Sequence, residues 1–401
     1  MSTRPATGTG SQGGAQPAQP WNRQRLRSNN EWLLWERLRT DGPLSRAQLA
    51  RDTGLSKPTV SAALAVLERG GLVREAGLLA PERGRVAVLY EPDPRAGHVL
   101  GVDIGRARLR VALADLSGRI LARRDVPNRG RSAGAVSDAV VAAAHEATEE
   151  AGLRPADVVH AAIGSPGVWD ESQRRLHYAG NLPGWGRRGL FERLADGLGT
   201  RISLHNDANL AALGEYADGA GAGSRVFVYL LIGTGLGMGV VSGGELQPGA
   251  GGAAGEIGLL PVAGGRQTLE GAAAAESVVR TARELGMRGT LTAKRVFEAA
   301  RAGDPAAQAA VLREAEQLAF AVAVVAAVLD PDLVVLGGGL GNGADLLLGP
   351  VERELHRLTP LRPRLAPSLL GNEAVLRGAL ANALLAARAE VFEQRTAAPG
   401  H

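Results

Sequence analysis

Four short segments combine glycines with carboxylate or amide side chains, and each could bind a phosphate or a polar ligand. In Gly101-Val102-Asp103-Ile104-Gly105 a carboxylate closes an apolar run and a glycine permits a sharp turn, as a site for a metal-bound phosphate requires. In Gly233-Thr234-Gly235 backbone N–H groups can form a concavity suited to an anion. In Asn206-Asp207-Ala208-Asn209 the carboxylate is placed as a general base for an alcohol. The fourth segment, Gly337-Gly338-Gly339, follows another apolar run.

Each segment alone is a weak signal, because a glycine turn after a strand is more often structural than phosphate-binding. A nominal G-x-G-x-x-A at residues 249–254 would suggest a dinucleotide site, but no strand precedes it within a βαβ unit. The sequence contains no G-K-[ST], which excludes a P-loop. Cysteine is absent, which excludes disulfides, iron–sulfur clusters and thiolate zinc sites. The chemistry must therefore rest on oxygen and nitrogen groups.

The four segments fall at the ends of apolar runs whose order predicts an α/β fold. A three-strand meander is expected from the runs at 99–103, 108–114 and 120–126. Alternating helices and strands are expected at 135–151, 158–164, 190–198, 202–206 and from 208 onward. A second round comprises strands at 225–232 and 237–242, long helices, and a strand at 333–337. Two similar halves imply a cleft between them.

Residues 21–95 predict a separate DNA-binding domain. A first helix is expected around residues 30–39, and Ser45 and Gln48 have the capping-box spacing that starts a second helix. Gly54 ends the second helix, and Ser56 can cap a third. Two short helices joined by a glycine turn are typical of a helix-turn-helix, whose recognition helix presents its early side chains to base edges. A helical bundle that merely contains a glycine turn is the alternative.

A basic hairpin is expected after the third helix. Its strands are predicted at 72–75 and 86–90, and the arginines of its loop make it a candidate wing of a winged helix. From Trp21 to Tyr90, 12 Lys and Arg residues stand against 7 Asp and Glu residues. This pattern fits binding to double-stranded operator DNA, although a solvated basic face would look the same. The expected DNA-contacting residues are Arg46, Ser56, Lys57, Thr59, Ser61, Arg83 and Arg85.

The composition sets further limits. Apolar residues make up 45% and charged residues 21% of the 401 residues, as in globular proteins with sizeable cores. Residues 1–20 are rich in Gly, Ser, Thr, Gln and Pro and predict a disordered tail. The longest apolar run, 318–329, falls well short of the roughly 20 residues that span a bilayer. No secretory signal is visible, so we expect a cytoplasmic protein without a membrane partner.

The order of these segments resembles the two-lobed actin-like (ribonuclease H-like) sugar kinase fold. The stretch Gly249-Ala250-Gly251-Gly252-Ala253-Ala254-Gly255-Glu256-Ile257-Gly258 is similar to the signature of the ROK family, whose name covers repressors, open reading frames and kinases. Asn181-Leu182-Pro183-Gly184-Trp185 and the Asn-Asp segment resemble further family motifs. With the N-terminal winged helix, the resemblance spans about residues 30–390. It implies a first lobe at 96–215, completed by a helix at about 374–395, and a second lobe at 216–373.

The resemblance also implies a sugar pocket beside a vestigial nucleotide site. The residues implied to bind sugar hydroxyls are Asn181, Asn206, Asp207, Glu256 and Glu270, although turn stabilisation would also explain the two asparagines. Asp207 takes the position of the kinase base. The implied nucleotide positions are Asp103, Gly105, Gly233, Thr234, Gly235, Gly337 and Gly338.

The sequence departs from the family pattern at three points. Arg106 and Ala107 stand where the kinases have Gly and Thr, and because phosphoryl transfer depends on positioning and charge stabilisation, we expect no kinase activity and a non-catalytic Asp207. Leu259 replaces a histidine that helps to orient the sugar-binding glutamate, Glu256. The family's cysteine motif is missing, so no zinc and no other metal or cofactor is expected.

We therefore predict a sugar-responsive transcriptional regulator, a repressor of carbohydrate-metabolism genes. Its effector would be a small sugar or sugar phosphate, and it would form a homodimer or homotetramer. The alternative is an ATP- and Mg²⁺-dependent sugar kinase, for a hexose or an N-acetylhexosamine, with an accessory DNA-binding domain. A constitutive DNA binder whose lobes only dimerise is a third interpretation. Whether ligand releases or promotes DNA binding stays open.

Overall fold

The computed structural model describes residues 23–80, 86–170, 172–178, 184–262 and 266–397. The chain divides into two compact units, an N-terminal unit of residues 1–93 with 395–401 and a C-terminal unit of residues 94–394. The tail expected at residues 1–20 lies outside the described residues. None of the described helices is both long enough and apolar enough to cross a bilayer.

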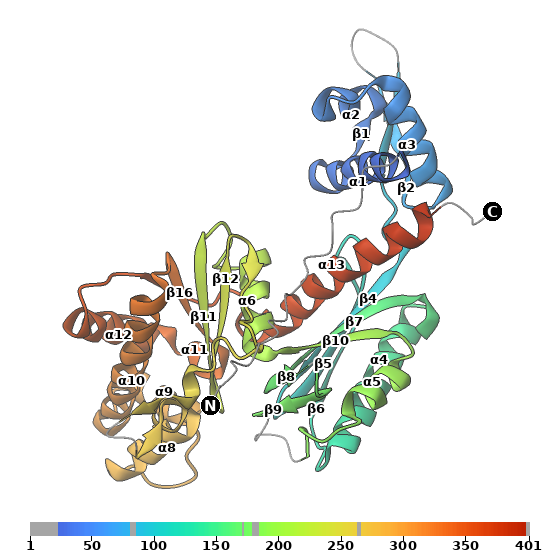
Figure 1. The fold of residues 1–401 in the computed structure, drawn as a ribbon. Helices are drawn as coiled ribbons and strands as arrows, with labels where there is room; N and C mark the ends of the chain where they lie inside the picture. Colours follow the sequence, from blue (N-terminus) through green and yellow to red (C-terminus); the bar gives the residue numbers. More distant parts are fainter. Residues whose placement is uncertain (1–22, 81–85, 171, 179–183, 263–265, 398–401) are drawn as a thin grey trace, which may run out of the picture. The chain divides into compact units, whose positions relative to one another are not determined.

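In its described residues the N-terminal unit has three helices followed by a hairpin (Figure 1). Its elements are α1 (Arg23–Asp41), β1 (Leu44–Ser45), α2 (Arg46–Thr53), α3 (Lys57–Arg69), β2 (Val73–Leu79) and β3 (Ala87–Pro92). The three strands form one sheet in the order β1-β3-β2. The predicted helices and the hairpin are confirmed.

Local sequence signals explain the helix boundaries of this unit. The Ser45 hydroxyl accepts a hydrogen bond from Gln48 N–H at 3.3 Å, and Gln48 Oε1 accepts from Ser45 N–H at 2.9 Å, so the capping box is confirmed. Gly54 follows α2 with φ +71°, a conformation that favours glycine. Behind the helices, Leu38 and Leu64 are fully buried. The helix-turn-helix is therefore held by its own core.

The first lobe of the C-terminal unit is built on a five-stranded sheet in the order β10-β7-β4-β5-β6. Its strands are β4 (His98–Ile104), β5 (Arg108–Asp115), β6 (Ile120–Pro127), β7 (Val158–Ser165) and β10 (Arg201–Asn206). The antiparallel meander β4-β5-β6 and the parallel strands β7 and β10 agree with the prediction. Two 3₁₀ turns, Pro94–Ala96 and Pro155–Asp157, precede β4 and β7.

Helices cover both faces of this sheet (Figure 1). α4 (Ala133–Glu150) and α5 (Leu190–Leu198) pack on the face that includes Leu100 and Val102. The opposite face contacts α13 (Ala374–Thr396), since a Cβ on Gly101 would lie 2.8 Å from Cγ of Leu380. This alternation follows from the period of two in a strand. A short hairpin, β8 (Val168–Asp170) and β9 (Arg175–His177), follows β7 and was not predicted.

The second lobe contains a five-stranded sheet in the order β13-β12-β11-β16-β17. Its strands are β11 (Val226–Ile232), β12 (Leu236–Ser242), β13 (Glu245–Leu246), β16 (Leu333–Gly337) and β17 (Arg364–Pro367), the last of which was not predicted. The helices are α6 (Asp207–Asp218), α7 (Leu269–Ala272), α8 (Ala275–Glu284), α9 (Ala293–Arg301), α10 (Pro305–Leu329), α11 (Gly338–Gly341) and α12 (Ala344–Leu358). Short pieces complete it: 3₁₀ turns at Ile257–Leu259 and Gly371–Glu373, and the pair β14 (Pro261–Val262) and β15 (Gln267–Thr268).

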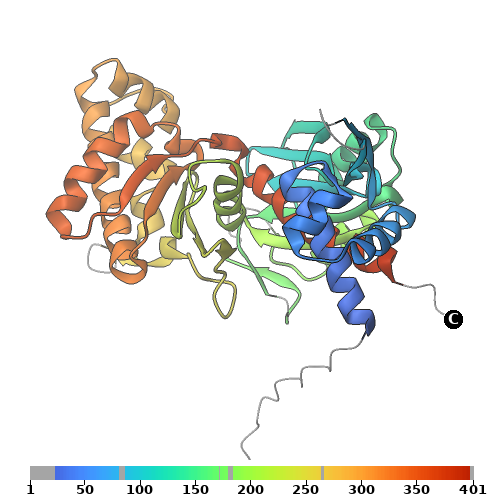
Figure 2. The ribbon, with the colours of Figure 1, turned by 90° about the horizontal axis from the view of Figure 1, so that it is seen from above.

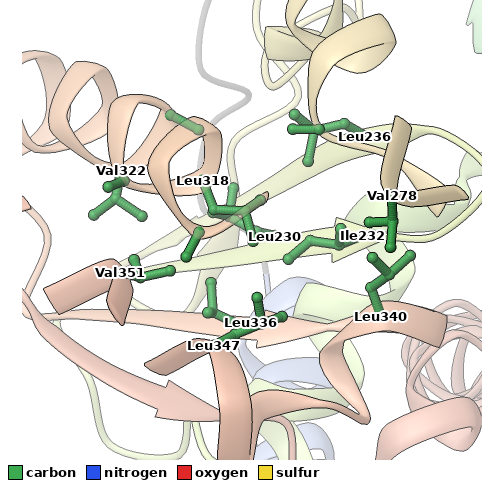
Figure 3. Packing of buried hydrophobic residues seen from close by; sticks show 14 of the residues in the cluster. Leu230, Ile232, Leu236, Val278, Leu318, Val322, Leu336, Leu340, Leu347 and Val351 are labelled. Carbon is green, nitrogen blue, oxygen red and sulfur yellow. The ribbon is translucent and has the colours of Figure 1, made fainter. Parts of the chain in front are cut away.

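The core of the second lobe lies between its sheet and a layer of helices. In Figure 2 the gold to orange-red helices gather on one side of the yellow-green strands. Figure 3 shows Leu230 and Leu336 of the sheet facing Leu318 of α10 and Leu347 of α12, and all four are fully buried. This burial supplies the main stabilisation of the lobe. It also fixes the ends of β11 and β16, where two of the glycine segments begin.

Helices α6 and α13 pack with their backbones almost touching. A Cβ on Gly378 would lie 1.7 Å from the carbonyl oxygen of Leu210, and one on Gly214 would lie 2.3 Å from that of Ala374. Only glycine permits so close an approach. The start of α13 is therefore fixed against α6, which itself begins at the Asn-Asp segment.

Candidate functional site

The glycine and acidic segments of both lobes line one cleft of the C-terminal unit, with a cavity volume of about 230 Å³. They meet because β4, β10, β11 and β16 all end at its wall. The sequence-predicted residues that line it are Asp103, Gly105, Asn206, Asp207, Gly233, Thr234, Gly235, Glu256, Glu270 and Gly338. Gly337 is not part of the lining, and Asn181 lies outside the described residues. The predicted cleft is confirmed.

On the first-lobe wall, Asp103 forms an ion pair that the sequence reasoning missed. Arg110 Nη1 lies 2.7 Å from Asp103 Oδ2, and both side chains are largely buried, with 16% and 7% exposure. The two residues are direct partners in the β4–β5 ladder. Burial raises the pKa of Asp103 to about 6, although the charge of Arg110 acts in the opposite direction. The hairpin register was the signal that could have revealed this pair.

On the wall formed by Asn206 and Glu256, one side-chain hydrogen bond joins the two lobes. Asn206 Oδ1 caps α6 by accepting from Ala208 N–H at 2.8 Å and Asn209 N–H at 3.2 Å. Its amide group points the other way, because Asn206 Nδ2 donates to Glu256 Oε1 at 3.4 Å. Burial, and then the negative charge of Glu270, raise the pKa of Glu256. The amide and carboxylate are therefore held side by side at the cavity.

Asp207 is the first residue of α6 and lines the same cavity. Its Oδ1 accepts from Ala208 N–H at 2.9 Å. Removal from solvent and, next, the negative charge of Asp103 raise the pKa of Asp207 to about 7. Near neutral pH such a group can therefore accept hydrogen bonds as a carboxylate or donate one as a carboxylic acid.

Glu270 has a structural contact in addition to its place in the lining. Its Oε2 accepts a hydrogen bond from Leu236 N–H at 3.1 Å, which holds the start of β12. Leu259, which replaces the family histidine, is 52% exposed and is not part of the cavity lining. Among the described side chains, Asn206 donates the hydrogen bond that Glu256 accepts, at 3.4 Å.

The second-lobe turn, Gly233-Thr234-Gly235, joins β11 to β12. Gly233 N–H donates to Gly235 O at 2.9 Å, and Gly233 O accepts from Ala275 N–H at 2.8 Å. Thr234 is exposed, and a Cβ on Gly233 would meet nothing within 4 Å. Next to it, Gly338 N–H donates to the hydroxyl of Tyr229 at 3.1 Å. This turn is anchored from behind and open toward the cavity.

Several residues of the lining were not among those expected from the sequence. Tyr178, with φ +58° and 65% exposure, lies at the end of the β8–β9 hairpin. Asn372 and Val375 bring the start of α13 to the cavity. Asn372 lies between Gly371, which also lines the cavity, and Glu373, so this short glycine and acidic segment was a signal that the sequence reasoning did not use.

In the N-terminal unit, the described candidate DNA-contacting residues differ in how exposed they are and in which contacts they make. Lys57 is exposed at the start of α3, whereas the hydroxyls of Ser56 and Thr59 lie 2.8 Å apart and bond to each other. Ser61 is half-buried on the same helix. Arg46 starts α2, with its guanidinium 5.1 Å from the Tyr90 ring centroid. Arg83 and Arg85 lie outside the described residues.

A helix-turn-helix unit and a two-lobed unit with a polar, glycine-lined cleft define a protein that joins a DNA-binding module to an actin-like sugar-kinase fold. The chain belongs to the ROK family. The model of the ROK family matches residues 99–386, and the model of the IclR helix-turn-helix domain matches residues 38–77.

Relatives include both enzymes and repressors. A glucokinase of Halalkalibacterium halodurans is 31% identical over 308 residues, covering 70% of this chain and 92% of the relative. A xylose repressor of Caldicellulosiruptor bescii is 23% identical over 385 residues, covering 90% of this chain and 96% of the relative. The fold is similar to that of a ROK family transcriptional regulator described as a homolog of the E. coli MLC protein, with a TM-score of 0.76, 20% identity and coverage of 92% and 99%.

Proposed function

We propose that this chain is a sugar-responsive transcriptional regulator that represses carbohydrate-metabolism genes. Its N-terminal unit would bind double-stranded operator DNA, and its cleft would bind a small sugar or sugar phosphate. The observation that carries the proposal is a helix-turn-helix joined to a cleft that keeps Asn206 and Glu256 on one wall, while Asp103 is paired with Arg110 on the other. The match of a xylose repressor over 90% of this chain supports it.

The polar wall suits a sugar. A sugar hydroxyl both donates and accepts, and amides and carboxylates can form two directed hydrogen bonds with neighbouring hydroxyls. Asn206, Asp207 and Glu256 line a cavity of about 230 Å³, a size suited to a small polar ligand. These three residues are the proposed sugar-binding set, together with Asn181 and Glu270 from the sequence.

A nucleotide with its magnesium ion does not fit the first-lobe wall. Magnesium prefers carboxylate oxygens, but Asp103 Oδ2 already accepts from Arg110 at 2.7 Å. Arg106 is exposed in the turn and lines the cavity. The nucleotide positions in this chain are therefore proposed to be vestigial, and Asp207 to be non-catalytic.

A sugar can change DNA binding only if it prefers one of two states of the protein. A hundredfold change in operator affinity requires roughly 2.7 kcal/mol of coupling free energy. Helix α13 offers a covalent route for this coupling, since Val375 lines the cavity and the residues from Arg395 onward belong to the N-terminal unit. A homodimer or homotetramer is proposed because helix-turn-helix dimers bind two half-sites.

The proposal is tested in two steps with the full chain. Operators are first selected from random DNA duplexes, and the affinity of the selected duplex is measured by fluorescence anisotropy. A panel of hexoses, pentoses, N-acetylhexosamines and their phosphates is then added. We expect one class to change the affinity at least about tenfold. Specific DNA binding that no sugar changes would favour a constitutive DNA binder, and light scattering would give the oligomeric state.

The DNA-binding unit has its own test in Lys57→Ala. If Lys57 contacts a phosphate, the variant should lower the slope of log affinity against log salt by about one. If it contacts a base, sequence preference should relax instead. Arg69→Ala, at the other end of α3, is the matched control and should leave both properties unchanged. Unchanged operator affinity in Lys57→Ala would show that α3 is not the recognition helix.

A sugar kinase is the second candidate, favoured by three observations. Asp207 stands at the position of the family base with a pKa of about 7, the Gly-Thr-Gly turn is retained, and a glucokinase is 31% identical. A coupled assay that detects nucleoside diphosphate, run over the same sugar panel, distinguishes the two functions. Turnover that Asp207→Asn abolishes would establish the kinase, and absence of turnover with a sugar-dependent DNA response would establish the regulator.

A further inference from the structure

Arg110 has a fixed place at the cleft because of the strand register. β4 and β5 pair with Ile104 opposite Leu109 and Asp103 opposite Arg110. The guanidinium therefore reaches Asp103 directly across the ladder, at 2.7 Å, and it also lines the cavity. Side chains directly opposite each other on neighbouring antiparallel strands are close enough to interact, and opposite charges there are stabilising.

A second carboxylate holds Arg110 from the opposite side. Arg110 Nε lies 3.6 Å from Asp125 Oδ2 on β6. Asp125 also pairs with Arg108 and lies 3.9 Å from Arg123. Arg123 in turn makes two bonds of 2.6 and 2.7 Å to Glu373. A ligand that displaced Arg110 would have to break its contacts with both Asp103 and Asp125.

Three backbone groups of the first-lobe turn are hydrogen-bonded within the chain. Gly105 N–H donates to Arg108 O at 3.0 Å, and Gly105 O accepts from Asn128 Nδ2 at 2.9 Å. Ala107 O accepts from Asn128 N–H at 2.9 Å. These bonds fix the backbone course of the turn, and the exposed side chain that the turn adds to the cavity is that of Arg106.

From this arrangement we propose that Arg110 is a specificity-determining residue that excludes magnesium nucleotides from the cleft. Its guanidinium forms an ion pair with the Asp103 carboxylate, the group that a hydrated divalent cation would need. The positive charge of Arg110 therefore lies where the cation would bind. The cleft would then bind a sugar but not a magnesium nucleotide. This inference rests on the proposed sugar-binding function and adds which ligand is refused and by which residue.

The effect of Arg110 is distinguished from that of Arg106 and Ala107, which depart from the family pattern, by a pair of variants. The double variant Arg106→Gly/Ala107→Thr restores the family residues in the turn but keeps Arg110. The triple variant adds Arg110→Ala. Binding of a fluorescent ATP analogue to the full chain is measured with and without Mg²⁺. We expect no saturable binding by the wild type or the double variant, and at least about tenfold tighter, Mg²⁺-dependent binding by the triple variant.

Three results would overturn the proposal. The wild type could bind the analogue with Mg²⁺ as tightly as the triple variant, the double variant could gain as much as the triple, or a folded triple variant could gain nothing. If circular dichroism shows that Arg110→Ala unfolds the chain, Arg110→Gln replaces it, since glutamine keeps a polar side chain without the charge. Arg110→Lys, which keeps the charge, is the matched control and should still refuse the nucleotide.

The outcome is separable from that of the proposed function. The nucleotide measurements use neither operator nor sugar, so Arg110 can fail as the excluding residue while the sugar-dependent DNA response persists. Conversely, a chain that refuses nucleotide and shows no sugar response in the DNA assay would retain this inference and lose the regulator.

Discussion

The two hairpin turns at the cleft carry different side chains but have the same pattern of hydrogen bonds at their first glycine. The β4–β5 turn and the β11–β12 turn each join antiparallel strands, and each has its glycine carbonyl fixed from outside, Gly105 O by Asn128 and Gly233 O by Ala275. The second turn retains Gly-Thr-Gly, whereas the first carries Arg106 and has Arg110 beneath it. Two turns of the same backbone construction thus present different charges to the cavity. Function therefore has to be argued from the side chains of the site and not from the fold.

The largest effect is expected where the second turn meets β16. Gly338 has φ +76°, and a Cβ there would lie 2.5 Å from Ile232 O, so Gly338→Ala should reduce the free energy of unfolding by about 3–5 kcal/mol. A Cβ on Gly233 meets nothing within 4 Å, and Gly233→Ala should cost less than about 1 kcal/mol. Urea denaturation measures both. Equal losses would show that the turn is not open toward the cavity.

A buried titratable group, Glu314 of α10, contacts the start of α8, the helix whose Ala275 N–H holds Gly233 O of the second turn. Ser277, in the first turn of α8, donates to Glu314 Oε2 at 3.0 Å, while Glu314 Oε1 is buried without a partner. Burial raises the pKa of Glu314 to about 8, so the native state favours the protonated acid. Its contribution to stability is complete below about pH 4.5 and is lost as the pH rises through 8.

Glu314→Gln should therefore flatten the dependence of stability on pH. Between pH 5 and pH 9 the wild type should lose a few kcal/mol more than the variant, measured by urea denaturation at each pH. Asp103 and Asp207 also have raised pKa values and make stability fall over a lower range, but they are present in both proteins. Parallel pH profiles would mean that Glu314 is ionised or solvated in the native state.

Much of this architecture could be predicted from the sequence, because short-range signals determine it. The Ser45–Gln48 capping box, the strand alternation and the turn glycines gave the helix-turn-helix, the meander and the cleft. The Arg110–Asp103 pair was also accessible in principle. Once the turn between Ile104 and Leu109 is placed, the ladder puts Arg110 opposite Asp103.

Other parts of the structure depend on contacts between residues far apart in the chain, and the periodicity of apolar residues does not reveal such contacts. The carboxylate of Glu215, fully buried in α6, accepts from Leu370 N–H at 2.9 Å and from the hydroxyl of Ser368. It fixes the segment that leads into α13, yet glutamate is ordinarily a surface residue. Strand β17 and the cavity residue Asn372 follow from the same long-range packing. Such residues become identifiable only when the second lobe is assembled.

On the sugar wall, Asn206→Ser should separate ligand binding from helix capping. Serine keeps the α6 cap but loses the amide that reaches Glu256, so sugar affinity should fall roughly tenfold to thirtyfold, or about 1.4–2 kcal/mol, with little change in stability. Thr234→Ala, on the retained turn, is the control and should change sugar affinity less than about twofold. Calorimetric titration with the effector measures both. The reverse pattern would assign sugar recognition to the second-lobe turn.

The smallest of the expected effects is that of a variant at Asn128. This variant tests whether the charge of Arg110 or the rigidity of the first turn prevents nucleotide binding. Asn128→Asp keeps the acceptor for Gly130 N–H but removes the donor to Gly105 O, which should cost about 1 kcal/mol of stability by urea denaturation. The equivalent bond of the second turn is made by a backbone N–H and is insensitive to such a change. If rigidity of the first turn excluded the nucleotide, Asn128→Asp would admit it. If Arg110 excludes it, the loosened turn should refuse the fluorescent ATP analogue as the wild type does.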